Sequence, residues 1–210
     1  MSSPLSRSGS GPGQREILEA AAIAFTRSGF AATTIDDIAD LLKATKGRVY
    51  HYYRAKADIF LDVVLTGMEE MIAGAQPIAV AADVEPESRL WRMAHHHAGL
   101  MMTRNSFQRV AVQAVEMHRL SEAPAQAQAL EKVIAMRDQY EQLFADVIEE
   151  GKQKGVFRDV DSRLATKPAL GALNWISLWY DPDRGDWSTV QRVASEYADF
   201  IVNGLRRSRA

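Results

Sequence analysis

The chain has 210 residues, of which 47% are hydrophobic and 25% charged. This is an ordinary globular composition with room for one or two compact units. There is no cysteine, so disulfides, thiolate metal sites and a cysteine nucleophile are excluded. No apolar run approaches the roughly 18 residues of a membrane span. We therefore expect no membrane partner and a location in the cytoplasm.

Charge is distributed unevenly along the chain, although the net charge is only −2. Residues 1–56 contain eight Lys or Arg and five Asp or Glu, whereas residues 57–210 contain 17 and 22. Five basic residues and no acidic residue fall within 43–56. Such a patch can bring one face of a protein to a polyanion such as DNA. From charge alone, a solvated charged segment with no binding role is an equally good interpretation of residues 43–56.

The first quarter of the chain predicts three helices behind a flexible arm. Residues 1–13 are rich in Ser, Gly and Pro and predict the arm. Helical periodicity over 14–28 ends at Gly29, a residue that can close a helix in the left-handed conformation. Thr34, with an acidic residue three positions later, predicts the cap of a second helix. Thr45 predicts the start of a short third helix over 46–52. Two short helices joined by a tight turn form a helix-turn-helix.

The third helix has the composition of a DNA-reading element. Val49 and Tyr53 are four residues apart and can face the core, which leaves the basic and polar positions outside. Arg and Lys can donate to guanine edges, and Gly47 allows a close approach of the helix to DNA. Hydroxyl, imidazole and ammonium groups can hold phosphates and fix the register. The candidate DNA-binding residues are Thr33, Thr34, Thr45, Lys46, Gly47, Arg48, Tyr50, His51 and Lys56.

The remaining residues, 57–210, predict an all-α body. Helical patterns cover 56–75, 88–103, 107–120, about 124–151, 165–180 and 188–205. Pro77 and Pro86 predict a loop over 76–87.

The segment 14–60 resembles the TetR family of repressors. The matching residues have the order and spacing of that family: Thr33-Thr34, Ile38-Ala39, Lys46-Gly47, Tyr50-His51-Tyr52-Tyr53 and Lys56. The chain departs from the family at Lys43, where Gly is usual, and at Ala55, where Ser is common. Lys at a left-handed turn position would be mildly strained.

The resemblance implies an all-α homodimer of about nine helices per chain. Residues 14–56 would bind a palindromic DNA operator, and residues 57–210 would hold an effector and dimerise. The last two helices would form the dimer interface, with candidate residues Trp175, Trp179, Val193, Tyr197, Phe200 and Ile201. Most such regulators are repressors that a ligand releases from DNA.

A second resemblance concerns the effector. Segments 95–97, 150–158 and 175–185 look similar to TetR relatives that respond to acyl-coenzyme A thioesters, including a repressor of sterol-ring breakdown. An acyl-CoA or another apolar small molecule is therefore the expected effector. Candidate pocket residues are Trp91, Met101, Met102, Phe107, Met117, Tyr140, Phe144 and Trp175. Each of them, taken singly, is more typical of a core. Several arginines could meet the CoA phosphates, and the sequence does not choose among them.

No catalytic or metal site is expected. Adjacent helical residues point about 100° apart, so His95, His96 and His97 do not converge on one ion. Phosphate loops, metal-ligand spacings and nucleophile elbows are missing from the sequence, which therefore predicts neither an enzyme nor a resident cofactor. The alternative function is a helical small-molecule-binding or protein-interaction module that does not bind DNA.

Overall fold

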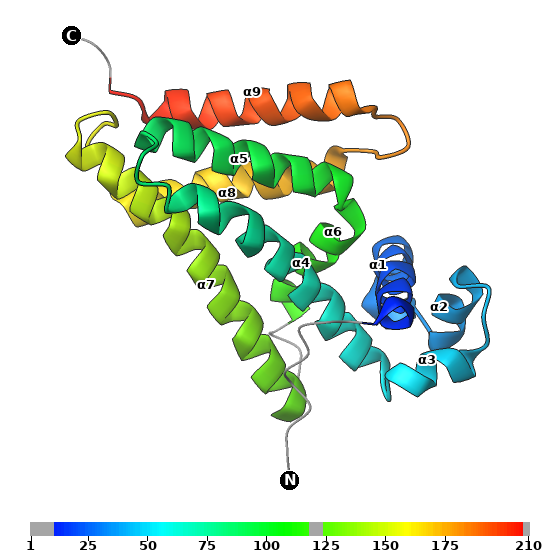
Figure 1. The fold of residues 1–210 in the computed structure, drawn as a ribbon. Coiled ribbons are helices and arrows are strands. Elements are labelled where there is room, and N and C mark those ends of the chain that lie inside the picture. The colour runs from blue at the N-terminus through cyan, green and yellow to red at the C-terminus, as the bar shows by residue number, and fades with distance from the viewer. Residues whose placement is uncertain (1–10, 118–123, 208–210) are drawn as a thin grey trace.

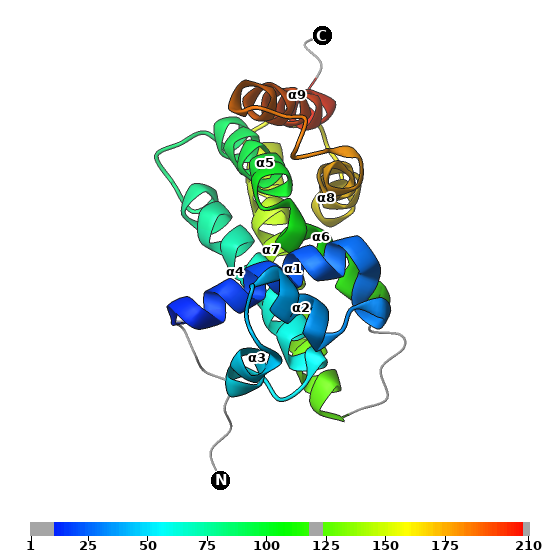
Figure 2. The same ribbon diagram turned by 90° about the vertical axis from the view of Figure 1, so that its right-hand side faces the viewer.

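The computed structural model describes residues 11–117 and 124–207, with backbone only for 115–117 and 124–129. These residues form nine helices and no strand, which confirms the all-α prediction. The helices are α1 Pro12–Ala32, α2 Ile35–Leu41, α3 Lys46–Tyr52, α4 Lys56–Ala79, α5 Pro86–Thr103, α6 Asn105–Met117, α7 Pro124–Gln153, α8 Ser162–Trp179 and α9 Trp187–Leu205. Helices α1–α3 form one end of the molecule, and α9 lies at the opposite end (Figure 1, Figure 2).

The two predicted signals of the N-terminal helices have different outcomes in the structure. Gly29 has φ 75° and kinks α1, which continues beyond the expected end to Ala32. The Thr34 hydroxyl accepts from the Asp37 amide at 3.1 Å, and the Asp37 carboxylate accepts from the Thr34 amide at 2.7 Å. These two bonds satisfy free donors at the start of α2.

The turn between α2 and α3 has the strain that the sequence predicts. Lys43 has φ 51°, and it is the one non-glycine residue with positive φ among those described. A side chain in this region is mildly unfavourable. The turn therefore keeps the left-handed conformation even without glycine.

The predicted loop over 76–87 is too long. Helix α4 continues through Pro77 to Ala79, and Pro86 is already in the first turn of α5. The end of α4 is held by tertiary contacts: Ala75 and Ala79 are buried, and the Arg89 guanidinium donates to the Ala79 carbonyl at 2.7 Å. Packing therefore outweighs the helix-breaking tendency of proline at this position.

Helix α4 contributes to both hydrophobic clusters of the protein. Its first half packs with α1, α2 and α3 through Ile59, Phe60 and Val63. Its second half packs with the body through Met68 and Met71. In Figure 1, α4 crosses the molecule diagonally between these two regions. None of the helices in 11–117 and 124–207 is long and apolar enough to span a membrane.

Candidate DNA interface and effector pocket

Helix α3 presents its polar side outward. Val49 is fully buried and Tyr53 is 5% exposed, as the four-residue spacing predicts. The outward positions are all exposed: Lys46, Gly47, Arg48, Tyr50 and His51. Because α3 lies at the end of the molecule remote from α9 (Figure 2), these side chains are open to a large partner.

Both cations of α3 are held by exposed carboxylates in the isolated chain. The Arg48 guanidinium contacts Glu16 of α1, and the Lys46 ammonium lies 3.7 Å from Asp36 of α2. Exposed pairs of this kind contribute about 0–1 kcal/mol. DNA can therefore displace these carboxylates at little cost.

The structure gives the predicted threonines three different environments. Thr33 is 1% exposed, and its hydroxyl donates to the carbonyls of Gly29 at 2.7 Å and Ala24 at 3.2 Å. A DNA contact by the Thr33 side chain is therefore a wrong prediction, because burial and these two bonds occupy the hydroxyl. Thr34 is exposed in the capping box of α2. Thr45 is exposed as the N-cap of α3, and its side chain makes no cap bond.

The predicted phosphate contact of Lys56 is also inconsistent with the structure. Its ammonium donates to the carbonyls of Phe30, Ala31 and Thr33 at 2.6, 3.2 and 2.6 Å. It also lies 4.6 Å from the centroid of the Phe30 ring. All three donors are therefore occupied by the end of α1, where a cation is favoured by the helix dipole. Lys56 joins α1 to the start of α4.

A polar cluster that the sequence did not predict joins the same helices. Gln14 donates to the Tyr53 hydroxyl at 3.0 Å, and this hydroxyl donates to the Asp62 carboxylate at 2.9 Å. Burial raises the pKa of Asp62, against the lowering effect of these hydrogen bonds. The available signal was an acidic residue on the otherwise apolar stripe of α4.

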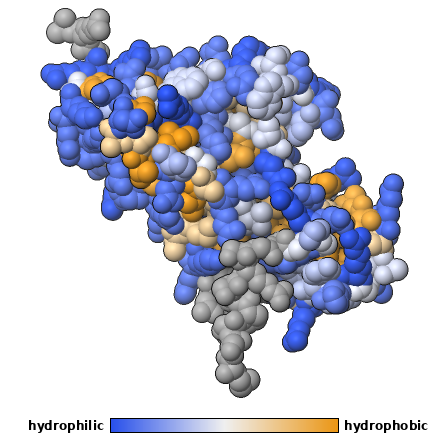
Figure 3. Space-filling view, viewed as in Figure 1, coloured by the Kyte–Doolittle hydropathy of each residue, from blue (hydrophilic) through white to orange (hydrophobic). Residues whose placement is uncertain are grey.

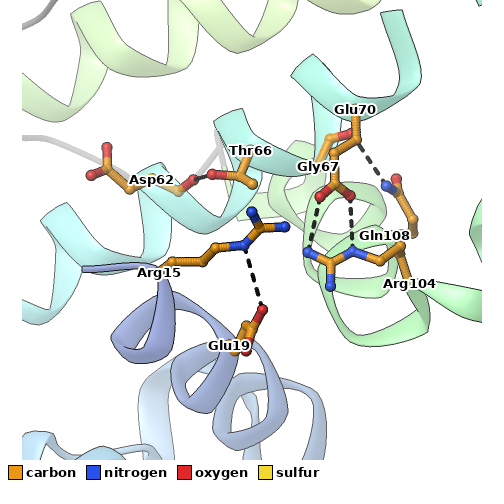
Figure 4. A network of polar contacts seen from close by, with 8 residues as sticks. All are labelled: Arg15, Glu19, Asp62, Thr66, Gly67, Glu70, Arg104 and Gln108. Carbon is orange, nitrogen blue, oxygen red and sulfur yellow. Dashed lines mark hydrogen bonds and ion pairs between the residues drawn. The ribbon is translucent and has the colours of Figure 1, made fainter. Parts of the chain in front are cut away.

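Helix α6 contacts both the DNA-binding end and α4. Arg104, just before α6, makes a two-point contact with Glu70 at 2.9 and 3.1 Å. The Gln108 amide donates to the Gly67 carbonyl at 3.2 Å, as Figure 4 shows. On its other side, α6 accepts a bond of 3.2 Å from Thr26 of α1 at the Ser106 carbonyl.

A cavity of about 280 Å³ lies among α4–α8. Its lining residues are Met68, Met71, His97, Met101, Gln108, Ala111, Val112, Arg137, Tyr140, Glu141, Lys167, Leu170, Gly171 and Asn174. Hydrophobic surface gathers over the α4 and α7 region of the body in Figure 3. The volume is slightly below the range of about 300–1,000 Å³ that is typical of small-molecule pockets.

Some of the predicted pocket residues line this cavity and others do not. Met101 and Tyr140 line the cavity, and Phe144 is buried beside Tyr140 with ring centroids 5.4 Å apart. Three other predicted residues, Met102, Phe107 and Trp175, do not line this cavity. Met102 and Phe107 are buried elsewhere in the packed clusters, and Trp175 is 61% exposed. Trp91 lines a separate surface hollow between α5 and α9. The Met117 side chain lies outside the described residues.

Two residues of the polar wall of the cavity, His97 and Asn174, were not among the predicted pocket residues, whereas the third, Tyr140, was. His97 is 1% exposed, with Nδ1 3.1 Å from the Tyr140 hydroxyl and Nε2 3.2 Å from Asn174 Oδ1. Burial lowers the pKa of His97 to about 3. The imidazole is therefore neutral near pH 7. An amide oxygen can only accept, so Nε2 holds the proton and Nδ1 accepts from tyrosine.

The charged residues of the cavity come from α7 and α8. The Lys167 ammonium lies 2.6 Å from the Glu141 carboxylate, and Lys167 is well exposed. Burial lowers the pKa of Arg137. Among the arginines that the structure describes, Arg137 is the one that lines the cavity.

The predicted dimer residues fall on two sides of the last helices. Trp175, Trp179 and Phe200 are 61%, 46% and 74% exposed. Val193 and Tyr197 are partly buried, and the Tyr197 ring stacks on Trp179. Ile201 is 5% exposed and faces the core, so its assignment to the interface is wrong. The exposed apolar residues that were missed on α8 and near the start of α9 are Leu164, Leu178 and Trp187.

The three histidines lie in different environments, as expected. His95 stacks on Trp91, His96 packs near Gly74, and His97 faces the cavity. Over the part of the chain that the structure describes, no three potential metal ligands come together.

Two family models match the chain. Residues 17–63 match "Bacterial regulatory proteins, tetR family", and residues 83–205 match "Tetracyclin repressor-like, C-terminal domain". The chain therefore belongs to the TetR family of bacterial regulatory proteins. Members of this family are transcriptional regulators and are typically dimeric. The family is not enzymatic, which agrees with the prediction from the sequence.

Named relatives cover nearly the whole chain. The transcriptional repressor KstR2 of Mycobacterium tuberculosis H37Rv is 27% identical over 202 residues, 91% of this chain and 92% of the relative. Among solved structures, PfmR of Thermus thermophilus is 31% identical, with a TM-score of 0.76 over 91% of this chain and 99% of that one. AibR, solved with isovaleryl coenzyme A and operator DNA, is 23% identical, with a TM-score of 0.72 over 92% and 98%. AibR thus shares the fold.

The position of Lys56 generates a prediction that distinguishes stability from DNA contact. Lys56→Met keeps most of the stem but leaves three carbonyls without their charged donor. We expect the free energy of unfolding to fall by about 1–3 kcal/mol, measured by urea denaturation. The slope of log affinity for duplex DNA against log salt should stay unchanged.

Arg54→Met is the matched control, since it removes one positive charge two residues before Lys56. Arg54 is exposed and has no ion pair among the described residues, so its loss should leave stability within about 0.5 kcal/mol. A salt slope lowered by about one in Lys56→Met, with normal stability, would show that Lys56 contacts phosphate.

Proposed function

We propose that the protein is a dimeric transcriptional repressor that a small effector releases from its operator. The main support is the position of α4. This helix packs in the core beneath α3 with its first half and lines the cavity with its second half. We propose residues 14–56 as the DNA-binding domain and 57–210 as the effector and dimerisation domain. The first half of α4 then completes the DNA-binding core.

The DNA contacts are assigned to the exposed side of α3. Arg48 and Lys46 supply donors for base edges, and Gly47 lets the helix enter the groove closely. Tyr50 and His51 hold phosphates, with Thr34 and Thr45 at the helix starts. The cytoplasm is the matching location, because the operator is chromosomal DNA.

The dimer is assigned to the exposed apolar face of α8 and α9. Trp175, Trp179 and Phe200 present large apolar groups that would be costly to leave in water. A two-fold pairing of this face places two α3 helices on one side of a palindromic operator.

The proposed effector is an acyl-CoA thioester. The support is the KstR2 similarity over almost the full chain, the isovaleryl-CoA in the AibR structure, and the cavity itself. Three methionines, two on α4 and one on α5, give that cavity an adaptable apolar lining. Arg137 would meet the anionic end of the ligand.

Release follows from the position of the cavity against α4 and α6. An effector that contacts Met68, Met71 and Gln108 binds one placement of these helices better than another. It can shift the equilibrium only by that difference in affinity. Both helices contact α1, so the separation of the two α3 helices changes with them.

Base reading by Arg48 can be tested on an operator selected from random duplexes by the full chain. Arg48→Ala should weaken operator binding by about 1–3 kcal/mol and relax the preference at one base position. Fluorescence anisotropy across the selected positions measures both effects. An unchanged base preference would exclude Arg48 from readout. The absence of salt-dependent binding to any duplex would favour the alternative, a helical module that does not bind DNA.

The dimer face can be tested with Phe200→Asp. A charge at this exposed position should not disturb the folded monomer but should be strongly unfavourable in an apolar interface. We expect sedimentation to change from dimer to monomer at micromolar concentration. Glu69→Lys, at an exposed position of α4 outside this face, is the control for a change of charge. A variant that remains dimeric would place the interface elsewhere.

The effector class can be tested by titration of acyl-CoA thioesters of four to ten carbons into the operator complex. At least one should release DNA at a concentration at which free CoA does not, because free CoA has no acyl group to contact the apolar lining of the cavity. Anisotropy of labelled operator measures the release. Release by an unrelated small molecule, with none by any thioester, would contradict the proposed class.

A further inference from the structure

The cavity has two chemically different walls. Met68, Met71 and Met101 belong to the apolar wall, and His97, Tyr140 and Asn174 form the polar wall. Both ring nitrogens of His97 are occupied within the polar wall, one by tyrosine and one by the Asn174 oxygen. The remaining hydrogen-bonding groups of that wall are therefore on Tyr140 and Asn174.

The structure gives the Asn174 amide a definite direction. Its Oδ1 atom lies at Nε2 of His97, so the NH₂ group points away from the imidazole. Among the described residues no acceptor pairs with this NH₂ group, and Asn174 lines the cavity. Gln108, the other amide of the cavity, uses one of its two N–H groups for the Gly67 carbonyl. Asn174, whose NH₂ group makes no bond to the described residues, therefore has more donor capacity for a ligand.

We infer that the effector has a carbonyl oxygen within its apolar part, and that Asn174 donates to this oxygen. The inference rests on the proposed effector function of the cavity. An alkyl chain at the same place would remove water from the amide and leave its donors unsatisfied. A site built to donate a hydrogen bond strongly rejects the analogue that lacks the acceptor.

The acceptor must be neutral. The imidazole, phenol and amide of the polar wall have no net charge, and burial of a carboxylate against neutral groups is expensive. The lysine of the cavity is paired with Glu141. Anionic groups of the effector are therefore expected at Arg137, and a keto or similar oxygen at Asn174.

The inference can be tested with two chain-matched pairs of thioesters: hexanoyl-CoA with 5-oxohexanoyl-CoA, and octanoyl-CoA with 7-oxooctanoyl-CoA. The two pairs place the oxygen at different depths. Calorimetric titration of the full chain should show that the oxo member of at least one pair binds about tenfold or more tightly. Equal affinities within both pairs would overturn this inference and leave the thioester proposal intact.

Asn174→Asp is the decisive variant because it keeps the shape and the acceptor for His97 but exchanges the donor for an oxygen. It should abolish or reverse the oxo preference. Asn174→Leu, which removes both, should also abolish it if the carboxylate variant does not fold. Asn203→Asp, on α9 and outside the cavity, should keep the full preference.

The outcomes separate the two proposals. A preference that survives in both Asn174 variants would overturn the role of Asn174. If no thioester of either pair binds or releases operator DNA, the acyl-thioester proposal fails, and the carbonyl inference fails with it.

Discussion

The rest of the structure depends on one shared helix, α4, which is buried at both ends in different cores. Ile59 and Phe60 fix its start beneath α3, and Met68 and Met71 fix its second half against the cavity. Packed interiors resist gradual deformation. A ligand that needs more room in the cavity therefore either moves α4 as a unit or does not bind. The Gln108 bond to Gly67 ties α6 to the same segment. The DNA-binding end and the effector site therefore share one mechanical element.

The basic segment 43–56 has two roles that charge alone cannot distinguish. Arg48 and Lys46 are exposed, and their carboxylate partners are weakly held. Lys56 has all its donors occupied by the end of α1. Transfer of Lys56 to a phosphate would leave three carbonyls unsatisfied, whereas transfer of Arg48 to a base edge frees only a solvated Glu16. The cost of losing the existing partner thus determines which cation is available to DNA.

Local patterns predicted much of the fold and the outer face of α3. The capping residues of α2, the left-handed Lys43 and the burial of Val49 follow from neighbours in sequence. The wrong predictions fall where a residue distant in sequence determines the local structure or the burial of a side chain. Pro77 stays in a helix because Arg89 holds the end of that helix. On α9, periodicity could not tell which of the adjacent Phe200 and Ile201 faces the core.

The cavity shows the same limit most clearly, since His97 and Asn174 are 77 positions apart and meet only in the folded body. Their contact fixes both the tautomer of the histidine and the direction of the amide. The low pKa of His97 means that this wall does not change charge between pH 5 and 8. Occupancy of the cavity therefore depends on the effector rather than on protonation of the wall. Because the polar wall is neutral, an anionic group of the ligand would bind at Arg137 instead. The ligand therefore needs a neutral oxygen for Asn174 and, at a separate point, an anionic group for Arg137.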